Sequence, residues 1–424
     1  MAADGARHAN KTHHATLTAP RVLDVGRGIA IVLVIYGHAL SPWVMDTHGW
    51  FLPSAFAQWK FGASFLMPFF FALSGMSWRC EKTFKIAFRE ALSLIFTAVM
   101  ASVIMDVVRA GLTLGGVSDA LHQAPVTPLE VVKHAARMLL YGDFYSISAL
   151  WFVGALALTR LLASVTTRLG AIASIVTAIV LIAAGLAAQM FMVRNYDQIY
   201  LLGGAFSFFM LGHAARHAFE RALTKPLWLT AASVIGGIIL FTTFGLNEGC
   251  TFDMAKRCGI PTLNNEFGVA MIYGAYGNLL LFAVSATAGV VFGLGVATFV
   301  TRFGGVLAVR FHSLGRSTLN LLIINGVVLE LVNPQVQAWI APKTPNGGLV
   351  FFLIVFVLSL ATTLGSYVVL RKPLKALRAF ARNLAQWPVE WGSRALSALT
   401  PRSVRVSASH ELPAGTGPTD RRAL

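Results

Sequence analysis

Arg27 and His38 are the residues of this chain whose types and spacing most clearly suggest chemistry. They lie eleven residues apart on one apolar segment. Eleven residues at about 100° each end about 20° past three full helical turns, so both side chains lie on one helix face. At about 1.5 Å per residue they are separated by about 16 Å along the axis. A cation and an imidazole are costly in lipid, so we expect this face to line a bundle interior or a wet cavity.

The chemistry available to this pair is proton transfer. The imidazole of His38 titrates near neutral pH, which suits a general base that takes a proton from an acceptor hydroxyl. A structural histidine bonded to a neighbouring helix is an equally good interpretation of a lone histidine at membrane depth. Arg27 alone is typical of a cation that anchors the inner end of a span. Asp24 either pairs with Arg27 or caps the helix start. The three residues together favour a catalytic role.

Composition places these residues in a membrane protein. Of the 424 residues 56% are hydrophobic and 12% are charged, which is about half the charged share of ordinary globular domains. Apolar stretches of about twenty residues recur along the chain and predict an all-α, polytopic bundle of transmembrane helices. The net charge of +16 would suit nucleic acid. The basic residues, however, concentrate in alternate connecting loops and at the C-terminus, so we expect membrane lipid and not nucleic acid as the partner.

We expect about ten membrane-spanning helices. They centre near residues 28–45, 61–78, 91–112, 145–164, 169–190, 198–215, 226–245, 272–299, 317–338 and 349–370. With the N-terminus inside, the inner segments carry roughly three times as many Lys and Arg as the outer ones, which predicts that both termini are cytoplasmic. Residues 273–278 are expected to form irregular, cavity-lining backbone that leads into a helix. The first twenty residues lack an apolar segment, so we expect no cleaved signal peptide.

The second span and the loop after it contain the candidates for binding a soluble anionic donor. Lys82, Lys85 and Arg89 form a basic inner loop whose cations suit phosphate groups. A positive-inside anchor is the other interpretation of this loop, and the commoner one. In the span itself, Ser74 is a fourth donor-binding candidate, and the small pair that it forms with Gly75 permits close approach of a neighbouring helix.

Three regions follow from the charge and hydropathy pattern. Residues 1–20 are expected to be a disordered cytoplasmic N-terminus, and 21–371 a transmembrane domain. Residues 372–424 are expected to form a basic cytoplasmic tail that starts with cations at helical spacing and ends in disordered Pro-, Gly- and Ser-rich sequence. In the longest outer loop, residues 128–140 have the apolar spacing of a short surface helix.

Several other polar residues need partners. Asn320 and Asn325 lie in the ninth span and must find partners inside the bundle. They are about 140° apart around the helix, so they do not share a narrow face. Cys250 and Cys258 share one short polar loop and could pair in an oxidising compartment. Three cysteines are too few for a thiolate metal site, and no metal is expected.

These motifs, in this order, resemble the membrane-bound acyltransferase-3 family, and most closely its fucose-4-O-acetylase-like and polysaccharide O-acetyltransferase branch. The resemblance rests on Arg27 and His38 with ten residues between them, preceded by Asp24, and on Pro-Phe-Phe-Phe-x-Leu-Ser-Gly at 68–75. Weaker matches lie at 150–156, 208–212 and 314–319. Together these motifs run from about residue 20 to residue 371.

The resemblance implies ten core helices and transfer of an acyl group, usually acetyl from cytoplasmic acetyl-CoA, to a glycan hydroxyl. His38 matches the base proposed for the family, and Arg27 matches its essential arginine. Two positions depart from the pattern. Lys85 and Arg89, with three residues between them, stand where relatives often carry Arg-x-x-Arg, and Asn325 stands where many relatives carry a histidine. Both departures leave open which residues of this chain contact the donor.

The sequence therefore predicts an acyl-CoA-dependent O-acyltransferase of the bacterial inner membrane, acting on an exported or cell-surface polysaccharide or its lipid-linked oligosaccharide precursor. In the simplest route, acyl-CoA approaches from the inner face and His38 deprotonates a sugar hydroxyl. An acyl-histidine intermediate is the other route, and succinyl is an alternative to acetyl. A transporter or flippase for a glycan or lipid-linked intermediate is the alternative function, because it too needs polar residues at membrane depth. The sequence leaves the oligomeric state open.

Overall fold

The computed structural model describes residues 18–44, 52–79, 84–116, 125–142, 147–191, 198–247, 268–340 and 349–399. Nearly all of these residues are helical, and the described part contains no strand beyond an isolated bridge between Ala270 and Ala275. The prediction of an all-α membrane bundle is confirmed. Cys250, Cys258 and Lys82 lie outside the described residues.

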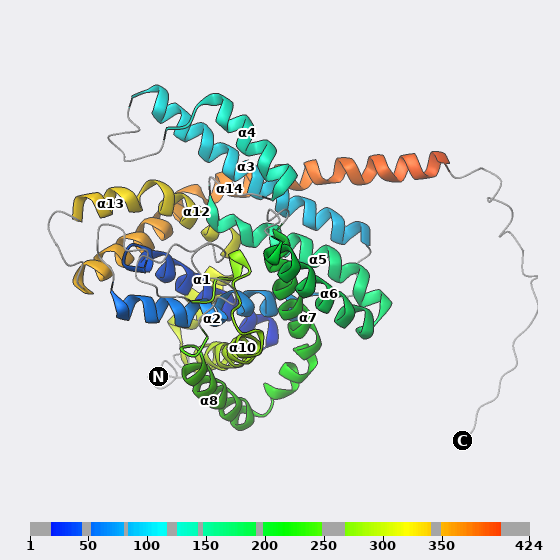
Figure 1. Cartoon of the computed structure of the whole chain (residues 1–424), viewed down its shortest axis with the longest axis vertical. Coiled ribbons are helices and arrows are strands. Elements are labelled where there is room, and N and C mark those ends of the chain that lie inside the picture. Colours follow the sequence, from blue (N-terminus) through cyan, green and yellow to red (C-terminus); the bar gives the residue numbers. More distant parts are fainter. Residues whose placement is uncertain are drawn as a thin grey trace, which may run out of the picture.

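The helices and two short 3-10 segments follow one another along the chain as shown in Figure 1. Their bounds are α1 (Ala19–Val44), α2 (Pro53–Met76), α3 (Phe84–Leu114), α4 (Pro128–Tyr141), η2 (Ser148–Leu150), α5 (Trp151–Leu169), α6 (Ala171–Met190), α7 (Ile199–Ala222), α8 (Pro226–Thr243), η4 (Met271–Tyr273), α10 (Leu279–Phe303), α11 (Val306–Arg316), α12 (Thr318–Leu331), α13 (Asn333–Ile340) and α14 (Leu349–Leu399).

Several of these helices suit a membrane. In the described part, seven are long and apolar enough to cross one, and the pair α11–α12, bent by 80°, would make an eighth. α2 and α7, expected to be the second and sixth spans, are of similar length but are not among the seven. The protein is thus a multi-pass membrane protein, and the count of about ten spans stays a prediction.

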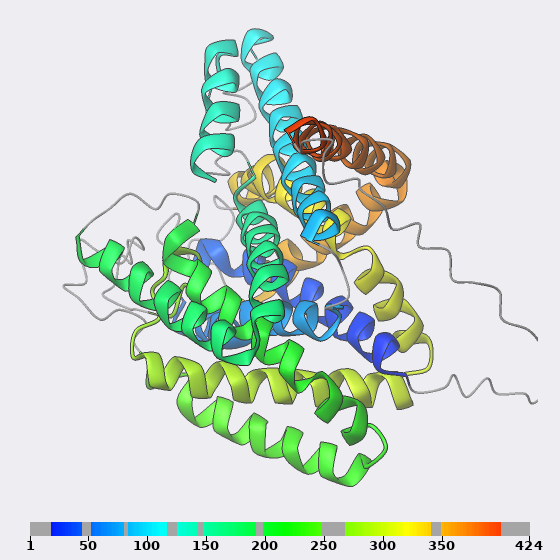
Figure 2. The ribbon, with the colours of Figure 1, turned by 90° about the vertical axis from the view of Figure 1, so that its right-hand side faces the viewer.

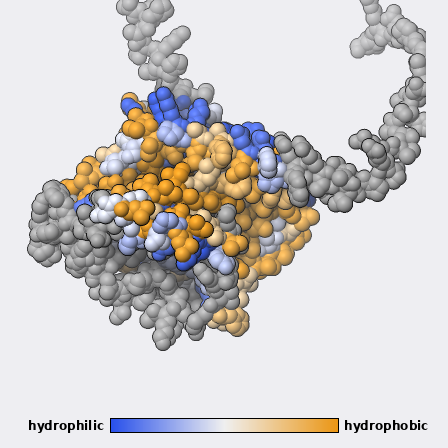
Figure 3. Space-filling view, turned by 90° about the horizontal axis from the view of Figure 1, so that it is seen from above, coloured by the Kyte–Doolittle hydropathy of each residue, from blue (hydrophilic) through white to orange (hydrophobic). Residues whose placement is uncertain are grey.

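The outermost helices present apolar side chains to their surroundings. The most apolar stretches of α6 and α8 are 17% buried inside the protein, whereas those of α1 and α5 are 56% buried. Large exposed side chains such as Ile172 and Leu227 lie on the outer helices. Apolar residues also dominate the described surface in Figure 3. A surface of this kind is stable against lipid chains and would be unfavourable in water.

α1 and α2 lie side by side near the centre of the bundle (Figure 1). α2 packs closely on α7 because both helices carry glycine at the crossing. A Cβ at Gly75 would overlap the carbonyl of Phe209, and one at Gly212 would overlap the carbonyl of Ala72. The close approach predicted at the Ser74-Gly75 pair is therefore confirmed, and it sets how the end of α2 meets its neighbours.

The irregular segment predicted before α10 is present. It contains η4 and two glycines with positive φ, Gly274 at 65° and Gly277 at 62°. The side chain of Asn278 caps α10 by accepting the backbone N–H groups of Leu280 and Leu281 at 3.0 and 3.1 Å. Asn247 donates to the carbonyl of Tyr276 at 2.9 Å. Side chains thus satisfy backbone polar groups that a helix would otherwise pair.

α4 confirms the short helix predicted in the longest outer loop. Thr127 and Glu130 form a capping box at its start. Hydrogen bonds from the backbone and side chain of Thr127 hold the pKa of the Glu130 carboxyl below its ordinary value. α4 is anchored to α3 by His134, whose Nδ1 lies 3.2 Å from Oδ2 of the fully buried Asp106. Figure 2 shows the two helices projecting together from the bundle.

α14 is a single helix of 51 residues that runs through the expected boundary between the membrane domain and the tail. The expected tail begins beyond residue 371, and this stretch is helical, as the spacing of its cations predicts. Arg378 on this stretch donates to Oδ1 of Asn320 at 3.3 Å, and Tyr367 bonds Ser317 at 2.7 Å. One cation of the basic stretch therefore binds the bundle itself. The cytoplasmic placement of the tail stays a prediction.

Candidate active site

His38 is held by a residue from a distant part of the chain. Its Nδ1 lies 2.8 Å from Oδ1 of Asn325, which projects from α12 and is 2% exposed. The amide oxygen faces the ring, so Nδ1–H donates and Nε2 carries the lone pair. Nε2 makes no hydrogen bond with any described residue. The geometry thus gives His38 the tautomer that a general base needs.

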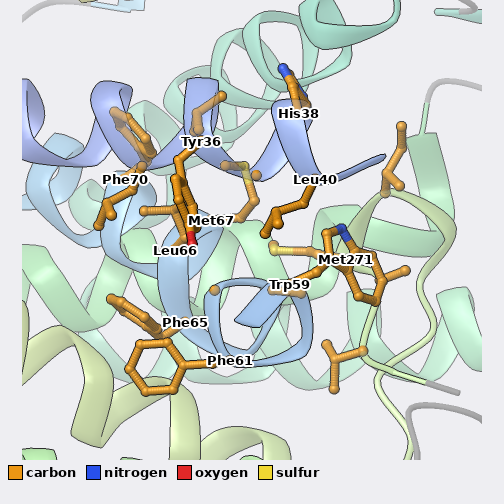
Figure 4. A pocket seen from close by; sticks show the side chains of 18 of the residues that line it. Tyr36, His38, Leu40, Trp59, Phe61, Phe65, Leu66, Met67, Phe70 and Met271 are labelled. Atoms are coloured by element: carbon orange, nitrogen blue, oxygen red, sulfur yellow. The ribbon is translucent and has the colours of Figure 1, made fainter. Parts of the chain in front are cut away.

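His38 lines a cavity with a volume of about 670 Å³. In Figure 4 the imidazole lies at the upper edge of the cavity, and Trp59, Phe61 and Phe65 stand below it. The wall is built from the C-terminal half of α1, the middle of α2, the start of α5, the end of α8, the segment around η4, and α12. Its volume falls within the range of small-molecule sites, about 300–1,000 Å³.

Arg27 lies at the other end of the same helix face. Its guanidinium donates to Oδ1 of Asp24 at 2.7 Å, to the carbonyl of Leu73 at 3.2 Å, and to the hydroxyl of Ser77. Of the two roles considered for Asp24, the structure shows pairing with Arg27. The planar fork therefore ties α1 to the C-terminal end of α2, which a single ammonium group cannot reproduce.

α11 completes the polar cluster around Asp24. Gly28 and Gly315 let α11 press against α1, because a Cβ at either position would overlap a backbone carbonyl of the other helix. This contact brings Nε2 of His312 to 3.6 Å from Oδ2 of Asp24. Asp24 thus stands between an arginine and a histidine, and its carboxylate orients Arg27 toward α2.

The structure keeps the two ends of this face apart. Arg27 does not line the cavity that contains His38. α1 is continuous from Ala19 to Val44, so the separation of about 16 Å given by the helical rise applies. Arg27 and His38 therefore cannot act on the same atom. They suit a long substrate held at one end and reacted at the other.

The described donor-binding candidates differ in exposure, and their role stays a prediction. Lys85 and Arg89 are exposed at the start of α3. Ser74 is 8% exposed within the core of α2. The hydroxyl that reaches Arg27 is that of Ser77, which sequence reasoning passed over.

Arg160 is a second cation that sequence reasoning missed. It lies on α5, a candidate span, and its Nε is enclosed without a hydrogen-bond partner among the described residues. The charge of Glu90 on α3 attracts it and the charge of Arg27 repels it. A charged residue within a membrane span is often functional. Arg160 lies outside the motifs that carry the family resemblance, so those motifs do not indicate it.

The remaining partners become visible only in the fold. Asn325 needs a partner inside the bundle on sequence grounds, but nothing in the sequence names His38 as that partner. His312 carries no signal of its own, since it lies in a short basic segment. In the described part, no group of three or more His, Cys, Asp or Glu could hold a metal ion.

Comparison with known proteins identifies the family of this chain. The family model of the acyltransferase-3 family, described as an acyltransferase domain, matches residues 21–371. The chain belongs to this family and is a membrane acyltransferase. No curated protein and no solved structure matches it. The family match does not favour the transporter alternative.

Proposed function

We propose that this protein is an acyl-CoA-dependent O-acyltransferase that modifies a hydroxyl of an exported or cell-surface polysaccharide, or of its lipid-linked precursor. The observation that carries the proposal is the bond between Nδ1 of His38 and Asn325 at the wall of a large cavity. It leaves Nε2 as the basic nitrogen of His38, at the wall of a cavity whose volume suits part of a substrate. The family match supports the acyltransferase part of this proposal.

The proposed reaction is a direct transfer. Nε2 of His38 takes the proton of the acceptor hydroxyl as its oxygen attacks the thioester carbonyl. The carbon–oxygen bond of the new ester forms, the carbon–sulfur bond breaks, and the proton passes from His38 to the departing thiolate. Asn325 holds the ring in place throughout and stabilises the imidazolium through the oxygen that accepts from Nδ1–H.

The donor is proposed to approach from the end of α1 that contains Arg27. Arg27 and Arg160 lie near enough for their charges to interact, and Lys85 and Arg89 are exposed at the start of α3. Such cations suit the phosphates of coenzyme A. The arm of the donor would then span the distance of about 16 Å to His38. The positive-inside pattern makes this end cytoplasmic and supports placement in the bacterial inner membrane.

Loss of the gene tests this proposal directly. Surface polysaccharide and lipid-linked glycans from cells with and without the gene are compared by mass spectrometry before and after mild alkaline hydrolysis, which removes ester-linked acyl groups. We expect one ester-linked acyl group to disappear with the gene and to return with the wild-type gene, but not with His38→Ala. Identical glycans in all four strains would refute the proposal.

A further inference from the structure

The wall of the cavity beside His38 is apolar. It is formed largely by aromatic and aliphatic side chains, among them Trp59, Phe65, Phe70 and Trp151. No Lys, Arg, Asp or Glu among the described residues lines it. Lys60, next to Trp59 in sequence, directs its ammonium to the carbonyl of Gly245 at 3.3 Å. A charged group inside this space would therefore lose its hydration without gaining an ionic partner among the described residues.

Three of the polar side chains in the wall already have partners. The hydroxyl of Tyr36 donates to Gln58. Gln58 in turn donates to the carbonyl of Ser54 at 3.0 Å. Thr318 donates to the carbonyl of Gly315 at 2.6 Å. A sugar ring buried here would leave most of its hydroxyl groups unsatisfied, which is unfavourable for each of them. The occupant is therefore apolar, and the glycan hydroxyl reaches His38 from outside this space.

The cavity is also large for a two-carbon group. Its volume is about 670 Å³, whereas a single water molecule in the liquid takes up about 30 Å³. His38 is part of the cavity wall, so an acyl chain whose carbonyl carbon stands near its imidazole can extend into this space. A chain several carbons long would bury its methylenes against the aromatic wall.

We propose that the cavity binds the acyl chain of the donor, and that this chain is uncharged and longer than acetyl. The proposal rests on the transferase function proposed above and specifies its donor. The transfer is the one already balanced: the carbon–sulfur bond of the thioester breaks, the ester bond forms, and the hydroxyl proton ends on the coenzyme A thiol. Compared with the transfer of an acetyl group, only the chain attached to the carbonyl carbon is different.

Three labelled donors test the proposal without any mutation. Membrane vesicles from cells that carry the gene receive acetyl-, butyryl- or succinyl-CoA, and ester-linked label is counted in their endogenous glycans. Vesicles from cells without the gene give the background. Each buried methylene favours binding by about fourfold, so we expect kcat/KM to be about 15-fold higher for butyryl, which has two more methylenes, than for acetyl. Succinyl has the same four-carbon backbone with a carboxylate at its end, and should be at least about a hundredfold poorer than butyryl.

Gly62 offers a way to fill the cavity. It lines the wall on α2, and a Cβ added there would meet no atom within 4 Å. Gly62→Leu should lower the ratio of butyryl to acetyl transfer at least fivefold. Gly111 on α3 also has open space around a Cβ, is not part of the cavity wall, and makes Gly111→Leu the matched control. Gly37→Ala, also in the wall, is the second filling variant should Gly62→Leu not accumulate.

The outcomes separate this proposal from the function on which it rests. Acetyl equal to or better than butyryl, with transfer lost in His38→Ala, would overturn the long-chain proposal and leave the transferase standing. Succinyl equal to butyryl would overturn the uncharged character of the chain. An unchanged donor ratio in a well-accumulated Gly62→Leu protein would place the chain elsewhere. No gene-dependent label from any donor would refute the proposed function itself.

Discussion

The hydrogen bond between His38 and Asn325 gives the sharpest test of the mechanism. Asn325→Leu keeps a side chain of similar size and removes the oxygen that accepts from Nδ1–H at 2.8 Å. The ring is then free to take the other tautomer, in which Nε2 bears the proton and cannot act as a base. The expected result is a fall in acyl transfer with normal accumulation of the protein.

The size of the fall follows from the burial of this bond. Asn325 is 2% exposed, and a buried donor left without a partner costs about 1–3 kcal/mol. Taking about 2 kcal/mol as the lost preference for the productive tautomer, kcat/KM should fall about 30-fold. Asn325→Asp keeps an acceptor for Nδ1–H and should retain far more activity than Asn325→Leu.

The assay is transfer of labelled acyl groups in membrane vesicles, with each protein quantified in the same vesicles. Asn320→Leu is the matched control, because this residue lies on the same helix but bonds Arg378. It should leave kcat/KM within about threefold of wild type, since it has no contact with His38. Wild-type transfer by Asn325→Leu, or better transfer by Asn325→Leu than by Asn325→Asp, would refute the assigned tautomer.

Three further predictions concern the ends of the proposed substrate path. His38→Ala should lower acyl transfer about 100- to 10,000-fold while the protein inserts and accumulates, and near-normal transfer by an accumulated protein would exclude it as the base. Arg27→Lys should lower transfer at least about tenfold, because an ammonium cannot reproduce the planar fork whose two terminal nitrogens reach acceptors on α1 and at the end of α2. If the lysine variant matches wild type, Arg27 is only an anchor. Neutralising Lys82, Lys85 and Arg89 together should raise the apparent KM for acyl-CoA more than that for the acceptor. Topology mapping is the control, and an unchanged KM in correctly inserted protein would assign the loop to orientation alone.

Much of the fold could be predicted because membrane helices are specified locally. Hydropathy and length indicate which segments cross a bilayer, and the irregular backbone before α10 and the surface helix α4 followed from local patterns that the structure confirms. The shared face of Arg27 and His38 followed from helical periodicity alone. The number of spans is harder to predict. α2 and α7 are not among the helices that are long and apolar enough to cross a membrane, and α11 and α12 form a bent pair.

What the sequence determined by itself is the kind of protein and the residues able to do chemistry. It gave a polytopic helical bundle, the axial spacing of Arg27 and His38, and a pairing of Asp24 with Arg27 as one of two choices. Only the tertiary structure decided the partners. Asn325 meets His38 across 287 positions of the chain, and Ser77 meets Arg27 across 50. Such contacts depend on how glycines let helices approach one another and on which faces meet. Periodicity fixes positions along and around one helix, but it carries no information about its neighbours.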